Sequence, residues 1–290
     1  MSTQLKEAPP VQVRAPAPRL EAERYNPVGA MLLLWERRQL LEIFVRRDFL
    51  GRYRGSLLGV LWPLINPLGH LLLYTFVFSV ILKVRFSHDG STSTFALYLM
   101  AGLLPWSALA EAVSRSTTCI LEVPNLVKKV VFPLEILPMV PVFSSFLTAG
   151  ISIVLLVSLA IFRTGTLHWT ILLLPLLVAV QGLLMGGLCW LLASLGVYIR
   201  DMKHLISLAL SVWMYTTPIV YPASAFPKQL GFLLWLNPMA GLVTDYRRLI
   251  IEGVLPDWSK LALYAAVTVV LWFAGNYFFM KTKRSFADVM

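Results

Sequence analysis

The most informative feature of this 290-residue sequence is how little charge it carries. Only 14% of its residues are Asp, Glu, Lys or Arg, against about 25% in an average soluble domain, whereas 58% are hydrophobic. So few charged side chains cannot cover a soluble globule of this size, and so apolar a composition excludes intrinsic disorder for most of the chain. We therefore expect one polytopic membrane domain instead of one or two soluble domains.

Motifs for nucleotide, metal or nucleophilic chemistry are also missing. The sequence has no G-x-x-x-x-G-K-[ST] phosphate loop, no H-E-x-x-H zinc motif and no G-x-S-x-G nucleophile motif. Its two cysteines, Cys119 and Cys189, lie in apolar runs, so we expect neither a disulfide framework nor a cysteine metal site. The four histidines are scattered, and a lone histidine is more often structural than catalytic. We therefore expect no catalytic residue, no metal and no cofactor on this chain.

The basic residues do not form the continuous face that nucleic-acid binding requires, although the net charge is +10. They form short clusters between apolar runs, as expected when positive charge sets membrane orientation. Thirteen Lys and Arg residues lie on one set of connections and seven on the other. The richer set is expected to face the cytoplasm, which places both termini inside and makes the number of spans even.

Six apolar segments are candidates for the roughly 20-residue helix that crosses a bilayer. They are Leu57–Leu82, Thr94–Leu121, Phe132–Phe162, Trp169–Tyr198, Leu205–Val220 and Leu261–Met280. The fifth is short and stops at prolines, and residues 222–256 are interrupted by Pro and Gly. Such irregular backbone is tolerated in a membrane only where protein or water covers it. We interpret 222–256 as two short helices that dip into the outer leaflet.

Residues Ala30–Leu50, ahead of the first span, have helical periodicity with one apolar face. Arg38, Glu42 and Arg46 occupy the opposite face, which is typical of a helix lying along the membrane interface. Such a helix could be only an anchor, or also a contact surface for a cytoplasmic partner. The predicted fold class is an all-α polytopic membrane protein with six transmembrane helices, this N-terminal amphipathic interface helix and a re-entrant helical pair before the last span. Its expected parts are a disordered cytoplasmic tail (1–28), the interface helix (29–56), the permease domain (57–283) and a cytoplasmic C-terminus (284–290).

Polar and aromatic side chains inside the predicted spans are the candidate channel or gate residues. Glu111 and Arg115 are four residues apart on one helical face, so they could gate a pathway or form a structural ion pair. Four aromatic residues lie deep in spans, where they could stack on sugar rings or simply face lipid or core: Tyr74, Phe78, Trp213 and Tyr215. Gly182, Gly186 and Gly187 predict close helix packing within the chain, or less commonly a dimer contact.

Four stretches together resemble a known family of membrane proteins. They are residues 46–67 (RRDFLGRYRGSLLGVLWPLINP), 124–133 (PNLVKKVVFP), 217–222 (TPIVYP) and 237–239 (NPM). In this order, from about Leu34 to Lys283, they resemble the permeases of type-2 ABC exporters for O-antigen, teichoic acid and capsule. The resemblance implies six spans, a homodimer and a separate cytoplasmic subunit that binds ATP and Mg²⁺.

In that family the interface helix and two cytoplasmic turns contact the ATPase. The resemblance assigns the first turn to residues 122–130 and the second to 199–203. The implied coupling contacts are Glu122, Pro124, Asn125, Leu126, Lys128, Lys129, Arg200 and Asp201. The function expected from the resemblance is export of a lipid-linked polysaccharide, most of all of O-antigen type, across the bacterial inner membrane.

The lipid-linked end of such a substrate would carry a diphosphate. Arg47, Arg52 and Arg54 are candidate contacts because guanidinium groups match phosphate oxygens, although each could equally anchor the cytoplasmic side. Two other functions remain open. The chain could export teichoic acid, capsule or a small hydrophobic drug or lipid, or it could be a membrane-embedded enzyme acting on lipid-linked sugars, which would need paired carboxylates or a histidine site.

Overall fold

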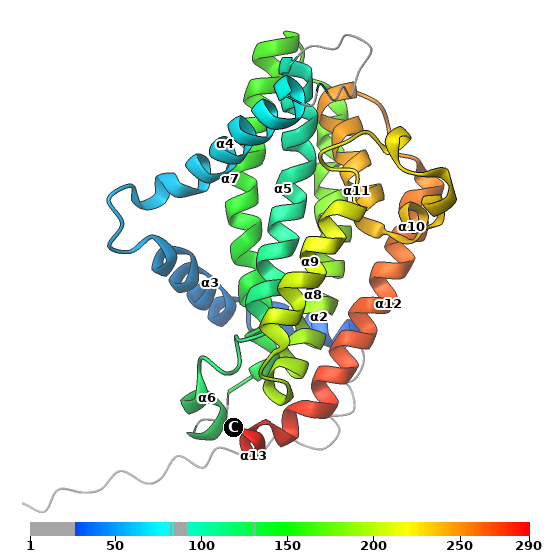
Figure 1. Cartoon of the computed structure of the whole chain (residues 1–290). Coiled ribbons are helices and arrows are strands. Elements are labelled where there is room, and N and C mark those ends of the chain that lie inside the picture. Colours follow the sequence, from blue (N-terminus) through cyan, green and yellow to red (C-terminus); the bar gives the residue numbers. More distant parts are fainter. Residues whose placement is uncertain (1–26, 82, 84–91, 130–131) are drawn as a thin grey trace, which may run out of the picture.

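The long helices of this chain form a bundle in which four of them lie side by side (Figure 1). The computed structural model describes residues 27–81, 83, 92–129 and 132–290, and every regular element in these ranges is helical. The four packed helices are α5 (Thr92–Ser116), α7 (Met139–Thr164), α8 (Leu174–Tyr198) and α9 (Met202–Thr216). Helix α12 (Trp258–Thr282) packs along α8, and α4 (Trp62–Tyr74), continued by the π-helical segment η2 (Thr75–Ile81), slants away from the bundle. The all-α prediction is confirmed for the described residues, and most of the predicted tail, 1–26, lies outside them.

Five helical segments among the described residues are long and apolar enough to cross a membrane. They are Trp62–Ile81, Thr94–Ser116, Leu134–Arg163, Trp169–Tyr198 and Trp258–Val289, matching five of the six predicted spans. Helix α9 is shorter than its predicted span: its 15 residues extend about 22 Å, against a hydrocarbon core of about 30 Å. The helix stops there because Thr217 precedes Pro218 and is extended, with φ −96° and ψ 132°.

Helices α8 and α12 approach so closely that only glycine fits between them. A Cβ atom on Gly275 would lie 2.0 Å from the carbonyl oxygen of Gly187, and one on Gly187 would lie 2.5 Å from that of Leu271. Gly186 makes room for Trp272, whose ring lies 4.5 Å from that of Trp190. The predicted close packing at Gly186 and Gly187 is therefore within one chain.

The predicted single interface helix is wrong in one respect, because the chain bends at Arg37 into two helices. Helix α2 (Pro27–Glu36) is apolar and packs on α12, whereas α3 (Arg38–Tyr53) packs on α7. The bend lets each helix cover a different part of the bundle. On α3, Leu41 and Val45 are buried. The predicted polar residues, Arg38, Glu42 and Arg46, are exposed.

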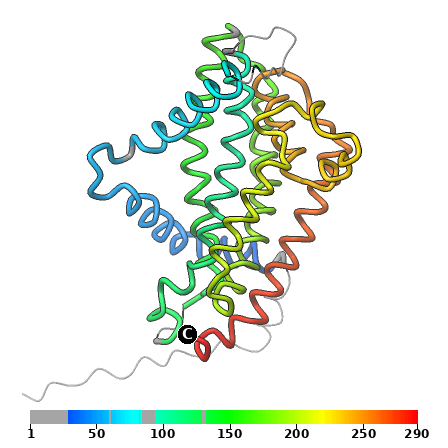
Figure 2. The backbone as a smooth tube through the Cα atoms, viewed as in Figure 1, coloured from blue at the N-terminus to red at the C-terminus, as the bar shows by residue number. Residues whose placement is uncertain are grey.

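The segment between α9 and α12 folds back on itself at the end of the molecule away from the C-terminus (Figure 2). It consists of η5 (Ala223–Ala225), η6 (Lys228–Leu230), α10 (Gly231–Leu236), α11 (Pro238–Arg247) and η7 (Arg248–Glu252). Helix α11 begins where Asn237 accepts a hydrogen bond from the Met239 amide at 3.0 Å. At the opposite end lie α6 (Pro124–Lys129) and α13 (Phe286–Val289), which contact each other. The remaining short turns are η1 (Gly59–Leu61), η3 (Leu134–Ile136), η4 (Trp169–Leu173) and η8 (Lys283–Ser285).

Candidate functional site

A cavity of about 530 Å³ lies where α4 slants away from α5 and α9. Its walls also include the end of α3 and one residue of α7, and its lining is mixed: Arg52, Asn66, His70, Tyr74, Trp106, Ser107, Glu111, Thr148 and Met214. Three predicted site residues that are far apart in the sequence, Arg52, Tyr74 and Glu111, therefore meet here. A concave site with apolar walls and a few convergent polar groups is the usual form of a ligand site.

The aromatic rings that line this cavity include His70, Tyr74 and Trp106. The ring of Tyr74 lies 5.9 Å from His70 and 6.1 Å from Phe78, each a helical turn away. Trp106 packs edge-on against Trp213, which does not itself line the cavity, at 5.7 Å. Trp213 is held in place because its indole N–H donates to Asn237 Oδ1 at 2.9 Å. Of the four predicted aromatic residues, Tyr74 lines the cavity, whereas Phe78, Trp213 and Tyr215 do not, and Tyr215 is 64% exposed.

Four charged side chains and a serine form a cluster at one end of the cavity. Arg52 donates to Asp48 at 2.8 Å, to Ser144 at 2.6 Å and to Glu111. Arg115 donates to both carboxylate oxygens of Asp48, one of them at 2.9 Å, and lies 3.8 Å from Glu111. The predicted pairing of Glu111 with Arg115 is thus one edge of a larger ion-pair cluster that ties α3 to α5 and α7.

Asp48 is the centre of this cluster, although it was not among the site residues predicted from the sequence. Burial alone would raise the pKa of its carboxyl, but hydrogen bonds from Arg115, Ser144 and Arg52 outweigh this effect and lower the pKa to about 2. Asp48 therefore stays ionised at physiological pH, and its stabilising contribution falls only as the pH drops from about 4 towards 2. The four-residue spacing of Asp48 and Arg52 was the sequence signal that could have found it.

The three arginines proposed for a diphosphate have different surroundings. Arg52 lines the cavity and, although it makes three contacts, its buried Nε has no hydrogen-bond partner. Arg47 stacks over the Phe44 ring, with its guanidinium carbon 4.7 Å from the ring centroid. Arg54 is exposed. Among these three, only Arg52 is placed to meet a ligand in the cavity.

The predicted coupling residues lie together at the end of the molecule that carries α6 and α13 (Figure 1). On and beside α6, Leu126 is half-buried, whereas Glu122, Pro124, Asn125 and Lys128 are exposed; Arg200 and Asp201 are exposed in the turn between α8 and α9. Val130 lies outside the described residues. A small cavity of about 110 Å³ is lined by Glu122 together with Arg47, Asp48 and Arg115. The segment before α6 therefore adjoins the ion-pair cluster.

Arg247 is one of the seven basic residues on the set of connections expected to face outward, but its side chain is buried. It donates to the carbonyl oxygens of Tyr98 at 2.9 Å, Pro218 at 2.7 Å and Ile219 at 2.7 Å. The bonds to Pro218 and Ile219 satisfy carbonyl groups that the broken segment after α9 leaves without helical partners, and the third bond reaches α5 at Tyr98. Arg247 therefore fastens that segment to α5.

Within the described ranges, no three His, Cys, Asp or Glu side chains lie together so that they could hold a metal ion. Cys119 and Cys189 are free thiols. The polar groups of the cavity are suited to binding and orienting a ligand, since arginines and carboxylates here are paired with one another.

Comparisons with known proteins show the family to which the chain belongs. The family model described as "ABC-2 type transporter" matches residues 39–248. The chain is 33% identical over 257 residues to an O-antigen export system permease protein RfbA of Myxococcus xanthus, covering 88% of this chain and 96% of the relative. It is 27% identical to an RfbA of Klebsiella pneumoniae over 87% of this chain and 95% of the relative. It is 23% identical to the polysialic acid transport protein KpsM of Escherichia coli over 81% of this chain and 90% of the relative. The chain is a multi-pass membrane protein that belongs to the ABC-2 type transporter family.

Proposed function

We propose that this chain is the permease subunit of an ATP-driven exporter that moves a lipid-linked polysaccharide, of O-antigen type, across the bacterial inner membrane. The observation that carries the proposal is the cavity between α4, α5 and α9, whose lining combines the aromatic rings of Tyr74 and Trp106 with the charged groups of Arg52 and Glu111. Each sugar hydroxyl costs several kcal/mol in hydrocarbon unless it finds a partner. A passage lined by aromatic faces and polar groups removes most of that cost.

The membrane topology we propose has six spans, with both termini in the cytoplasm. Helix α9 together with the residues up to Val220 makes the fifth span, and α10 with α11 forms the re-entrant pair on the outer side. Two observations support this arrangement. The broken segment and the α6–α13 end lie at opposite ends of the bundle (Figure 1). Arg247 also satisfies backbone carbonyls of the segment after α9, as depth in a membrane requires.

Two copies of the chain are proposed to complete the channel. The outer faces of α4 and α9, which border the cavity, carry large exposed apolar side chains: Leu72, Leu73, Phe76, Leu208 and Val212. A second copy packed against these faces would enclose the cavity and join it to its counterpart.

The energy is proposed to come from a separate subunit that binds ATP and Mg²⁺. The sequence contains no phosphate loop of its own. The exposed residues of α6 and of the turn at Arg200 and Asp201 are the proposed docking surface. Movement of α6 would shift Glu122, which lies beside Asp48 and Arg115. Because the Asp48–Arg115 ion pair holds α3 to α5, the movement would reach the larger cavity.

The diphosphate of the substrate is proposed to engage Arg52, exchanging with Glu111. Both Arg52 and Glu111 line the cavity, so a phosphate oxygen could replace the Glu111 carboxylate as an acceptor for this guanidinium. Arg115 keeps Asp48 as its partner during this exchange, so the cluster stays assembled. Arg47 and Arg54 would contribute long-range attraction at the cytoplasmic surface.

Charge reversal on α6 tests this function. The Lys128→Glu, Lys129→Glu double variant is expressed in a strain that lacks the chain. Surface polysaccharide should fall by about 90% relative to complementation with the wild type, because like charges would then oppose the docking contact. Membrane insertion and yield should be unchanged. Surface polymer is measured by antibody or lectin staining, and intracellular lipid-linked polymer by gel electrophoresis. The matched control is Lys228→Glu, an exposed lysine at the opposite end.

Wild-type polysaccharide on the surface of the α6 variant would refute docking through this helix. Normal surface polysaccharide in the strain lacking the chain altogether would refute the proposed function itself.

A further inference from the structure

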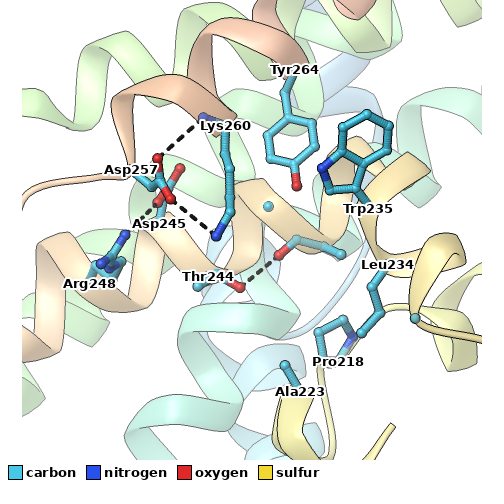
Figure 3. A pocket seen from close by; sticks show the side chains of 13 residues that line it. Pro218, Ala223, Leu234, Trp235, Thr244, Asp245, Arg248, Asp257, Lys260 and Tyr264 are labelled. Carbon is cyan, nitrogen blue, oxygen red and sulfur yellow. Dashed lines mark hydrogen bonds and ion pairs between the residues drawn. The ribbon is translucent and has the colours of Figure 1, made fainter. Parts of the chain in front are cut away.

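A second cavity, of about 320 Å³, opens at the end of the molecule away from α6 (Figure 3). It lies between α10, α11 and the beginning of α12, and it is separate from the cavity described above. Its two opposite walls differ in chemistry, since one is ionic and the other aromatic.

The ionic wall consists of two acid–base pairs whose charges cancel. Lys260 Nζ lies 3.1 Å from Asp257 Oδ2, and Arg248 lies 4.0 Å from Asp245. The Asp245 side chain is 5% exposed, and Asp257 also accepts from the hydroxyl of Ser259 at 2.6 Å. A balanced wall offers both donors and acceptors without attracting a net charge. It therefore favours a neutral ligand whose groups can donate and accept, as hydroxyl groups do.

The aromatic wall consists of Trp235 and Tyr264, whose side chains lie next to each other in Figure 3. Trp235 is 56% exposed, whereas Tyr264 is 5% exposed. Gly241 determines the position of Tyr264, because a Cβ atom there would lie 1.8 Å from the phenol ring. The exposed indole leaves a large apolar face uncovered beside the polar groups.

We propose that this cavity binds one neutral sugar ring of a glycan. The C–H face of the ring would stack on Trp235, and its hydroxyl groups would donate to Asp245 and Asp257 and accept from Lys260 and Arg248. The volume is in the range of small-ligand pockets, and the charge balance disfavours a phosphate or an amine. This proposal rests on the proposed function, because a glycan reaches this end of the molecule only if the chain exports one.

The test uses the full chain purified in a detergent without a sugar head group, so that the detergent does not compete. Saturation-transfer NMR is recorded with D-mannose, D-galactose, L-rhamnose and N-acetyl-D-glucosamine, each added alone. At least one sugar should receive saturation on its ring protons. Trp235→Ala should weaken that binding about tenfold, whereas Trp235→Phe should restore most of it.

Trp258→Ala is the matched control, because Trp258 is 51% exposed at the same end but does not line the cavity. It should leave the signal unchanged. No transfer to any of the four sugars, or an equal signal in the Trp235→Ala variant, would overturn the proposal. Absence of sugar binding to the wild-type chain, while surface polysaccharide still depends on the chain, would reject this site alone. Normal surface polysaccharide without the chain would reject the proposed function.

Discussion

An Asp48→Asn variant is expected to lose most of its polysaccharide export and about 3 kcal/mol of folding stability, the low end for breaking a buried ion pair because the cluster is partly exposed. Asp48 accepts hydrogen bonds from both Arg52 and Arg115. Asparagine keeps the shape but removes the charge, so Glu111 is the one carboxylate of the cluster left to neutralise two guanidinium groups, which repel each other. Thermal unfolding of the purified protein and surface polysaccharide in complemented cells measure the two effects.

Glu42→Gln is the control for this variant, since Glu42 is an exposed carboxylate on the same helix. A double-mutant cycle with Arg115→Gln isolates the contact. The stability loss of the double variant should be smaller than the sum of the two single losses. Additive losses, or an Asp48→Asn variant as stable as Glu42→Gln, would mean that the cluster does not fasten α3 to α5.

Gly275→Ala is expected to abolish most of the folded protein, although it adds a single methyl group. The added Cβ would lie 2.0 Å from the carbonyl oxygen of Gly187. The Cβ is bonded directly to the α12 backbone and the oxygen belongs to the α8 backbone, so no flexible side chain can move aside. Overpacking of side chains already costs about 1–3 kcal/mol, and a backbone clash must separate α8 from α12 along much of their length. Fluorescence-detected size-exclusion chromatography of tagged protein measures the folded yield.

The comparison variant is Gly150→Ala on α7, where an added Cβ meets nothing within 4 Å. Its yield should equal or exceed that of the wild type, because alanine favours a helix over glycine by about 1 kcal/mol. Equal yields of Gly275→Ala and Gly150→Ala would show that α8 and α12 are not packed as closely as described.

The sequence predicts the bounds of a helix well where the length of an apolar run alone determines them. The segment Trp169–Tyr198 was predicted with the same bounds as the structural span, because it contains no charge and ends at polar residues. The fifth segment was extended too far, since Ile219 and Val220 are apolar but follow Pro218. Local backbone geometry outweighed hydropathy there. The bend at Arg37 was missed because both halves of that helix carry apolar residues at helical spacing.

The candidate site was only partly predictable, because its contacts join distant segments. The sequence shows two pairs of opposite charges four residues apart: Glu111 with Arg115, and Asp48 with Arg52. It does not indicate that the two pairs meet. Packing of α3 on α5 and α7 brings them together. Likewise, Arg247 resembles an outward-facing charge until the carbonyl groups after α9 are seen to surround it.

The most direct test of ATP-driven export through the cavity is translocation by purified components. The chain is co-purified with the proposed ATP-binding partner, reconstituted into liposomes and supplied with a fluorescent lipid-linked oligosaccharide. Exposure of the sugar is measured with a glycosidase that cannot cross the bilayer. The sugar is expected to move to the opposite leaflet only when ATP and the partner are both present. Tyr74→Ala in the cavity is expected to slow this movement. Movement by the isolated chain without ATP, or an unchanged rate in Tyr74→Ala, would contradict ATP-driven export through the cavity.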